Sequence, residues 1–395
     1  MLTMPMNIEP TVLIVGAGPA GLGCAIALKQ CGIEDVLILD KRGVGATFEA
    51  WPRQMKLLTP SFHSNPFGAV DLNAITPNTS PADFLHTQHP TGAEYASYLQ
   101  AVARHYQIRV EIGEVRSLVK GRDMFTVQTS AGLISPRFII WAAGEFSHPD
   151  TRGITGADLC LHSSQVRDWS LLRGEKFSII GGFESGIDAA LHLAWLGKEA
   201  HLLSRGEPWG DHSSDPSRTL SPRTRDRLRR CILDAPGSLH FYKHADIVKI
   251  TETRTGFELT DAVGTPFQSP TAPILATGFH SSLDIISRHF SWRGGHAILD
   301  ETTDESSTTP GLFYSGPSLV HREAMFCFIY KFRARFGIIA RTIAQRLSKP
   351  WEEPLRLWRE RGFMVEDLAC CTDCKCAVDS DEADNPEVSE YAVAA

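Results

Sequence analysis

The sequence predicts an α/β protein built on two similar βαβ units, and two stretches of the chain support that prediction. In each stretch a short apolar run, typical of a strand, leads into a glycine-rich turn, and a segment with helical spacing follows. A second apolar run comes after each helical segment. The chain has 395 residues, 43% of them hydrophobic, so we expect two domains, each with its own core.

The first unit begins with the apolar run at residues 11–15, which leads directly into Gly16 to Gly21, a G-x-G-x-x-G turn. Glycines at these positions permit a tight turn, a close approach of a pyrophosphate and close packing of helix against strand. The strand expected at 36–40 ends in Asp40, which can accept hydrogen bonds from a ribose 2′-OH. The unit is therefore predicted to bind a dinucleotide. The residues expected to contact it are Gly16, Gly18, Pro19, Ala20, Gly21, Asp40 and Lys41.

The second unit repeats the pattern, with a strand expected at 177–180, a helix at 187–196 and a strand at 200–204. Phe183 stands where the middle glycine of the motif is expected, so the ligand backbone is expected to lie slightly differently. The last strand ends at Ser204-Arg205 without an acid, and a guanidinium attracts a 2′-phosphate that a carboxylate would repel. NADPH is therefore favoured over NADH, although Glu207 lies nearby. The expected contacts are Gly181, Gly182, Ser185, Gly186, Ser204 and Arg205.

Charge and hydropathy restrict the class of protein. The formal net charge is −7, and the stretch 378–395 holds six acidic residues and no Lys or Arg, so the rest is nearly neutral and no nucleic-acid surface is expected. The uncharged segment 11–28 contains glycines and a proline, and no basic region precedes it. We therefore expect neither a signal peptide nor a membrane span, and a cytoplasmic protein. Its nine cysteines then suggest thiols, metal ligands or redox groups.

The two motifs, with WAAGEFSHP (141–149) between them and ILATGFH (274–280) after the second, resemble the two-dinucleotide-binding-domain flavoproteins. The resemblance runs from Val12 to Leu347. It implies FAD at the first site, NAD(P)H at the second, and a chain that returns to the FAD domain through a segment (309–319) that contacts the flavin. Further cofactor contacts are implied at Ala143, Gly144, Gly278 and Gly316.

The predicted organisation has four parts. The FAD-binding domain comprises 9–165 and 281–348, and the NAD(P)H-binding domain comprises 166–280. A helical connector is expected at 349–368, and a cysteine-rich motif with an acidic, disordered tail at 369–395.

Within the superfamily, the chain looks similar both to flavin monooxygenases and to thioredoxin-reductase-like proteins, including those that reduce low-molecular-weight disulfides. It departs from each. The reductases usually carry a cysteine pair beside the flavin, but no cysteine lies in the 40s or 50s or between Gly186 and Cys231, and Gly316-Pro317 replaces their Gly-Asp. The monooxygenases place an asparagine near the flavin, where this chain has Pro60, with Asn65 a displaced candidate.

The segment CCTDCKC, at 370–376, contains Cys370, Cys371, Cys374 and Cys376. Three interpretations stay open: a mobile thiol relay that carries electrons from the flavin, a site for a soft metal ion such as Zn²⁺ or Cu⁺, and an inert tail. A relay arm could also reach across a homodimer interface. The remaining cysteines, Cys24, Cys31, Cys160, Cys231 and Cys327, are expected to be structural, as is His321.

The sequence therefore predicts an FAD-dependent NADPH oxidoreductase that passes electrons to a disulfide or thiol-bound small substrate, through the C-terminal cysteines. A flavin monooxygenase acting on an N-, S- or carbonyl-containing substrate is the first alternative. A metal-binding or redox-sensing flavoprotein is the second.

Overall fold

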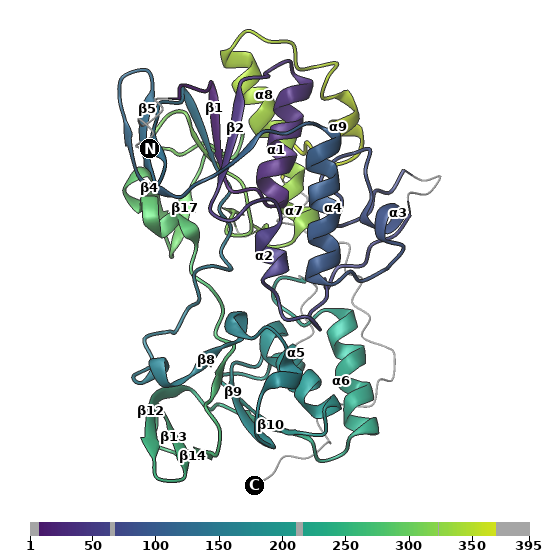
Figure 1. Cartoon of the computed structure of the whole chain (residues 1–395), viewed down its shortest axis with the longest axis vertical. Coiled ribbons are helices and arrows are strands. Elements are labelled where there is room, and N and C mark those ends of the chain that lie inside the picture. The colour runs from purple at the N-terminus through teal and green to yellow at the C-terminus, as the bar shows by residue number, and fades with distance from the viewer. Residues whose placement is uncertain (1–7, 64–67, 211–215, 323, 369–395) are drawn as a thin grey trace, which may run out of the picture. The chain divides into compact units, whose positions relative to one another are not determined.

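The structure is a computed structural model that describes residues 8–63, 68–210, 216–322 and 324–368. These residues form two units (Figure 1). The first contains residues 8–49, 59–147 and 281–368, and the second contains residues 50–58 and 148–280. Each unit is built on a five-stranded parallel sheet of its own.

The sheet of the first unit has the strand order β18-β7-β1-β2-β3. Its strands are β1 (Val12–Val15), β2 (Val36–Asp40), β3 (Val110–Ile112), β7 (Phe138–Trp141) and β18 (Leu312–Tyr314). β1 lies in the middle and is buried along its whole length, which explains its unbroken apolar sequence. The strand β18 pairs with β7 although residues 148–280 of the second unit lie between them in the sequence.

Helix α1 (Pro19–Gln30) packs closely against α8 (Phe336–Arg346). Pro19 suits the first helical turn because the N–H that it lacks would have no intrahelical partner there. Gly23 permits the close approach of α8, since a Cβ added at Gly23 would lie 2.1 Å from a ring carbon of Phe336. The closing helix therefore covers the helix that follows the first glycine turn.

Smaller elements complete the first unit. Its antiparallel strands are β4 (Val115–Lys120), β5 (Phe125–Thr129), β6 (Gly132–Ile134), β16 (Ser291–Arg293), β17 (His296–Ile298), β19 (Val320–His321) and β20 (Ala324–Met325). Its other helices are α2 (Ala46–Glu49), α3 (Pro81–Leu85), α4 (Gly92–His105), α7 (Ile329–Phe332) and α9 (Arg356–Glu360).

The second unit has the parallel order β11-β10-β9-β15-β8 and a separate antiparallel sheet. The parallel strands are β8 (Leu161–His162), β9 (Lys176–Ile180), β10 (Glu199–Ser204), β11 (Leu239–Lys243) and β15 (Ile274–Leu275). The antiparallel strands are β12 (Ile247–Thr253), β13 (Gly256–Asp261) and β14 (Pro266–Ser269), and the helices are α5 (Glu184–Trp195) and α6 (Pro222–Asp234). Apolar side chains fill both faces of the parallel sheet, with the helices on one face and β12–β14 on the other.

The predicted α/β class is confirmed, and the four strands of the two motifs form where the sequence analysis expects them. Helix α5 begins at Glu184 rather than Ile187, because Ser185 and Gly186 adopt helical conformation in its first turn. The segment 148–165, assigned from sequence to the first domain, lies in the second unit of the structure, since β8 pairs with β15.

Candidate nucleotide sites

The first glycine turn connects β1 to α1, and two of its glycines are required by the backbone itself. Gly16 has φ +111°, and an added Cβ would lie 2.2 Å from the carbonyl oxygen of Ala142. A Cβ on Gly21 would lie 1.9 Å from the carbonyl oxygen of Gly16. The turn is therefore closed on itself and against the end of β7.

Gly18 differs, because the space beside it is empty. It is the N-cap of α1 with extended backbone, φ −85° and ψ −170°, and a Cβ placed there would meet nothing within 4 Å. No side chain caps the helix, so the free N–H groups of the first turn, beginning with Ala20 because Pro19 has none, face this space from the positive end of the helix dipole. A pyrophosphate such as that of FAD fits this arrangement.

Asp40 ends β2 and orders the loops around the turn. One carboxylate oxygen accepts a hydrogen bond from the N–H of Ala17 (2.8 Å), and the other accepts from the N–H groups of Arg42 and Gly43 (both 2.8 Å). A carboxylate has about four acceptor positions, so capacity remains for a ribose hydroxyl. Lys41 instead donates to Glu114 at 2.7 Å, in an exposed ion pair.

The residues that the family resemblance adds lie at the same edge of this sheet. Ala143 and Gly144 follow β7 and Gly316 follows β18, and neighbouring strand ends are joined by the bonds Ala142 N–H to Val15 O (2.8 Å) and Ser315 N–H to Trp141 O (3.0 Å). Ligands of parallel α/β sheets bind outside the carboxyl ends of strands, where connections run to both sides of a central strand. The structure brings all these residues together at such an edge.

Glu145 is a residue at this edge that the sequence analysis missed. It follows Gly144, and the hydroxyl of Ser318 donates to its carboxylate at 3.4 Å. Burial raises the pKa of the Glu145 carboxyl above its usual value. No motif singles this residue out.

The second glycine turn has the same construction. Gly181 has φ +114°, and its added Cβ would lie 2.3 Å from the carbonyl oxygen of Ala276, while that of Gly186 would lie 1.8 Å from Gly181 O. Phe183, in the place of the middle glycine, has φ −92° and ψ −164°. Phe183 therefore has nearly the same backbone conformation as Gly18. The difference between the two positions is the aromatic ring of Phe183, which is partly exposed.

A cavity of about 350 Å³ opens at this turn. Its volume is within the range of small-molecule and cofactor sites. Of the expected residues, Gly181, Gly182, Ser204 and Arg205 line it. Ser185 and Gly186 lie in the first turn of α5. Gly278, with φ +92°, follows β15. Its carbonyl oxygen accepts hydrogen bonds from Asp150 N–H (3.0 Å) and His162 Nε2 (3.1 Å).

Two charged residues of this cavity were not predicted. Arg152 donates from Nε to the carbonyl oxygen of Thr277 (3.1 Å), and burial followed by repulsion from Arg205 lowers the pKa of its guanidinium. Asp246 places a carboxylate oxygen 4.0 Å from Arg205 Nε. The sequence analysis considered only Glu207 near Arg205 and missed Asp246, because Asp246 comes from a loop after β11. The charged groups that line the cavity are therefore two guanidinium groups and one carboxylate.

Cys370, Cys371, Cys374 and Cys376 lie outside the described residues, as does Asn65. None of the five cysteines of the described part of the chain is in a disulfide. Burial raises the pKa of Cys24 and of Cys31 to about 12, and that of the half-buried Cys160 to the same value. Cys327, expected to be structural, is exposed.

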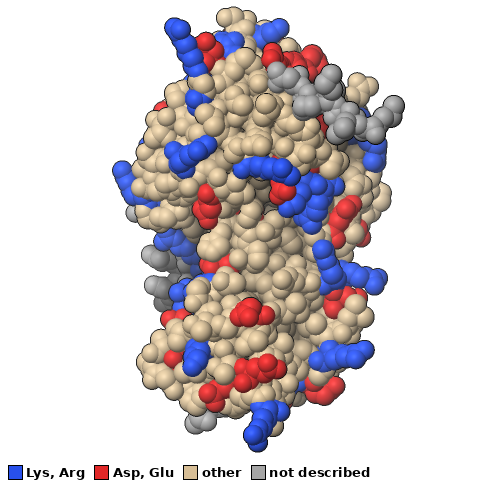
Figure 2. Space-filling view, turned by 60° about the vertical axis from the view of Figure 1, so that its left-hand side comes forward, with Lys and Arg blue, Asp and Glu red and all other residues tan. Residues whose placement is uncertain are grey.

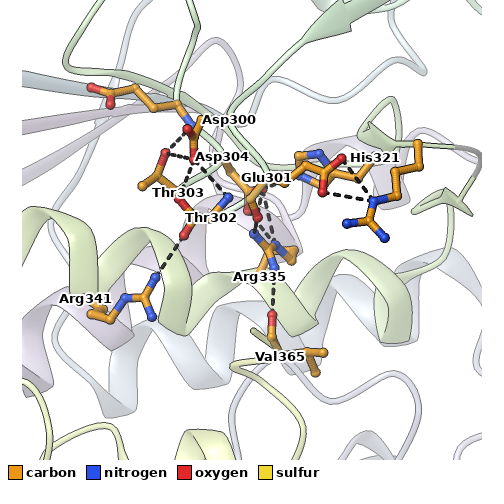
Figure 3. Close-up of polar contacts among 11 residues, drawn as sticks. Asp300, Glu301, Thr302, Thr303, Asp304, His321, Arg335, Arg341 and Val365 are labelled. Carbon is orange, nitrogen blue, oxygen red and sulfur yellow. Dashed lines mark hydrogen bonds and ion pairs between the residues drawn. The ribbon is translucent and has the colours of Figure 1, made fainter. Parts of the chain in front are cut away.

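His321 has a structural environment, as expected. Its Nε2 lies 2.5 Å from Asp304, and both side chains are almost completely buried (Figure 3). Asp304 also accepts from the buried guanidinium of Arg335 (2.9 Å), which donates further to two backbone carbonyls, at Glu301 and Val365. The imidazole is thus committed to an internal polar network of the first unit.

The surface offers no single dominant charge on the face drawn in Figure 2, where basic and acidic side chains are interspersed. Among the helices of the described chain, none is long and apolar enough to cross a bilayer.

Two glycine turns, each at the carboxyl edge of a parallel sheet, are the construction of a protein with two dinucleotide-binding domains. Residues 13–316 match the family model described as pyridine nucleotide-disulphide oxidoreductase, and the chain belongs to that family. The comparison with known relatives agrees with this family assignment. The chain is a flavin-dependent NAD(P)H oxidoreductase, which confirms the enzyme class and the cofactors at that level.

Among its relatives, bacilliredoxin reductase Bdr of Bacillus subtilis is 27% identical over 86% of this chain and 99% of its own length. The flavin-containing monooxygenase FMO GS-OX2 of Arabidopsis thaliana is 25% identical, but the match covers 52% of this chain and 51% of the monooxygenase. Among solved structures, bacillithiol disulfide reductase from Staphylococcus aureus has a TM-score of 0.72 at 22% identity, covering 86% of this chain and 99% of that one. The flavin-containing monooxygenase from Stenotrophomonas maltophilia has a TM-score of 0.66 at 17% identity, covering 87% and 100%.

Proposed function

We propose that the protein uses NADPH to reduce a small disulfide or thiol-bound substrate. The observation that carries this proposal is the extent of sequence similarity. The relative named as a bacilliredoxin reductase matches over 99% of its length, whereas the monooxygenase relatives match over about half of theirs. In the overall reaction NADPH, a proton and a disulfide give NADP⁺ and two thiols. A bound flavin would accept the hydride from NADPH and pass the electron pair on toward the disulfide.

Each glycine turn has a binding role in this reaction. The first would hold the FAD pyrophosphate at Gly18 and the N-terminus of α1, with Asp40 on the ribose. The second would hold NADPH in the cavity of the second unit. Arg205 would contact the 2′-phosphate, supported by the positive charge of Arg152.

The C-terminal cysteines are the proposed point of exchange with the substrate. A thiolate attacks a disulfide sulfur, a mixed disulfide forms, and a neighbouring thiol releases it, which Cys371 and Cys374 suit by their C-x-x-C spacing. The cysteines of the described chain that the structure buries are poor candidates, because their thiolates are scarce at neutral pH. Such exchange requires a reducing compartment, and we propose the cytoplasm.

An anaerobic titration with NADPH tests this role. The full chain is compared with a truncation after Leu368 and with a full-length variant that has serine at Cys370, Cys371, Cys374 and Cys376. The full chain should take up more than one electron pair per flavin, and both variants only one. Both variants should also lose disulfide reduction while keeping FAD and NADPH. Equal uptake by all three proteins would rule out the thiol relay.

A flavin monooxygenase remains the second candidate function, favoured by several monooxygenase relatives. It predicts a different result. NADPH consumption in air would rise when a nucleophilic amine or sulfide is added, and the serine variant would behave as the native protein does.

A further inference from the structure

Glu199, His201 and His240, which we name the imidazole cluster, lie together on β10 and β11 of the second unit. His201 and His240 are direct partners in the parallel register, and Glu199 lies two residues before His201 on the same face of the sheet. One ligand atom from each of the three side chains lies within 4.8 Å of the others. The sheet itself therefore brings a carboxylate and two imidazoles to one point.

The cluster is distinct from the nucleotide cavity. It lies near the amino ends of its strands, whereas Ser204, which lines the cavity, ends β10. Leu203 also lines the cavity, so the nearest lining residue of β10 lies two residues, about 7 Å, from His201. Nucleotides bind at the carboxyl ends of parallel strands, so the dinucleotide does not explain why these side chains converge.

The donor atoms converge on the carboxylate. Oε1 of Glu199 lies 2.5 Å from Nε2 of His201 and 3.2 Å from Nε2 of His240. The two imidazole rings are stacked, with centroids 4.4 Å apart and planes at 24°. The hydroxyl of Tyr242 lies 3.1 Å from Nδ1 of His201, so a hydrogen bond holds that ring with Nε2 toward Glu199. Partners of this kind commonly orient the histidine ligands of metals.

We propose that Glu199, His201 and His240 form a binding site for a divalent transition metal ion of the Zn²⁺ type, with water as the remaining ligand. Two imidazoles and a carboxylate are a donor set that zinc takes in proteins. Metal–ligand distances of about 2.0–2.2 Å place tetrahedral donors roughly 3.3 Å apart. The 3.2 Å between Glu199 and His240 already fits. Glu199, whose side chain is 38% exposed, has room to retract from His201.

Lys176 competes for the same carboxylate. Its Nζ lies 3.4 Å from Oε1 of Glu199, and both side chains are 38% exposed. An entering cation must displace this ammonium group. Removing the ammonium should therefore tighten metal binding, which a merely hydrogen-bonded cluster would not predict.

The test is a titration of the full-length protein with Zn²⁺ by calorimetry, and with Co²⁺ followed by its visible absorption. The four C-terminal cysteines are replaced by serine in every protein, because their thiolates would bind the same ions. We expect one ion per chain. His240→Ala and Glu199→Gln should each weaken binding by roughly 10- to 100-fold or more. Lys176→Met should bind severalfold more tightly.

His240 suits the test because its side chain is 31% exposed and its loss should leave the fold intact. The matched control is His105→Ala, which removes an exposed histidine from the first unit and should bind as the parent does. Thermal melting and NADPH binding verify that each variant is folded. Absence of saturable binding in the parent, or equal affinity of the parent and His240→Ala, would overturn the proposal.

Discussion

Gly18 and Phe183 occupy equivalent positions in the two glycine turns and have nearly the same backbone angles, −85°, −170° and −92°, −164°. Any L-residue can adopt such angles, so glycine at position 18 is not required by the backbone. What differs is the space beside each residue, which is empty at Gly18 and holds an aromatic ring at Phe183. We therefore expect that position 18 is glycine because of the ligand and not because of the turn.

Gly18→Leu should consequently fold normally and bind no FAD, because its side chain would occupy the space of the pyrophosphate. Flavin absorbance of the purified protein measures binding, and circular dichroism measures folding. The comparison variant is Gly21→Ala, whose Cβ would clash with Gly16 O and should damage the fold itself. Full flavin content in Gly18→Leu would contradict the assignment of this site.

Arg205→Ala should weaken NADPH binding by roughly 10- to 150-fold, the effect of losing one charge-assisted phosphate contact of about 1.5–3 kcal/mol. Steady-state kinetics with NADPH and NADH measure the change. NADH is the internal control, since it lacks the 2′-phosphate and its KM should stay nearly constant. An unchanged KM for NADPH would show that Arg205 does not bind the phosphate.

Among the helices, α8 is fixed in part by a buried ion pair at its start. Arg335 precedes α8, is 0% exposed, and pairs with Asp304, which is also 0% exposed and carries His321 on its other side (Figure 3). Charges taken out of water in this way depend on one another, because either one alone would be left uncompensated.

Arg335→Met should therefore destabilise the protein by about 3–5 kcal/mol, because it leaves Asp304 buried without its cation. Urea unfolding followed by tryptophan fluorescence measures the free energy of unfolding. Arg356→Met, which removes an exposed pair with Glu360, is the control and should change little. Comparable stability of the two variants would show that the buried pair is not required.

The sequence predicted the elements that are apolar along a run, and missed those assembled from distant segments. The strands β1, β2, β9 and β10 belong to the predicted group. Arg152 and Asp246 were missed because they reach the cavity from loops with no local motif. The antiparallel strands β12–β14 also escaped prediction, since most of their side chains are partly exposed and they show no continuous apolar run.

At the scale of the whole molecule, none of the five described cysteines is in a disulfide, and three of them, Cys24, Cys31 and Cys231, are buried. At pH 8 iodoacetamide should modify Cys24 and Cys31 only after denaturant is added, because burial raises the pKa of each to about 12 and few thiolates exist below it. Mass spectrometry of peptides locates the modified sites. Exposed Cys327 is the positive control. Rapid modification of Cys24 in the native protein would contradict this.

The pairing of β7 with β18 has a consequence for how the protein is made. During translation, residues 148–280 leave the ribosome before β18, so the sheet of the second unit can form while the first sheet still lacks an edge strand. Leu312 and Phe313, which are completely buried in the finished protein, must then join a partly built core. The first glycine turn and its partners Asp40 and Ala142 are synthesised early, whereas the strand end at Gly316 is added to the same edge only after the second unit. We therefore expect the proposed FAD site to be completed near the end of synthesis.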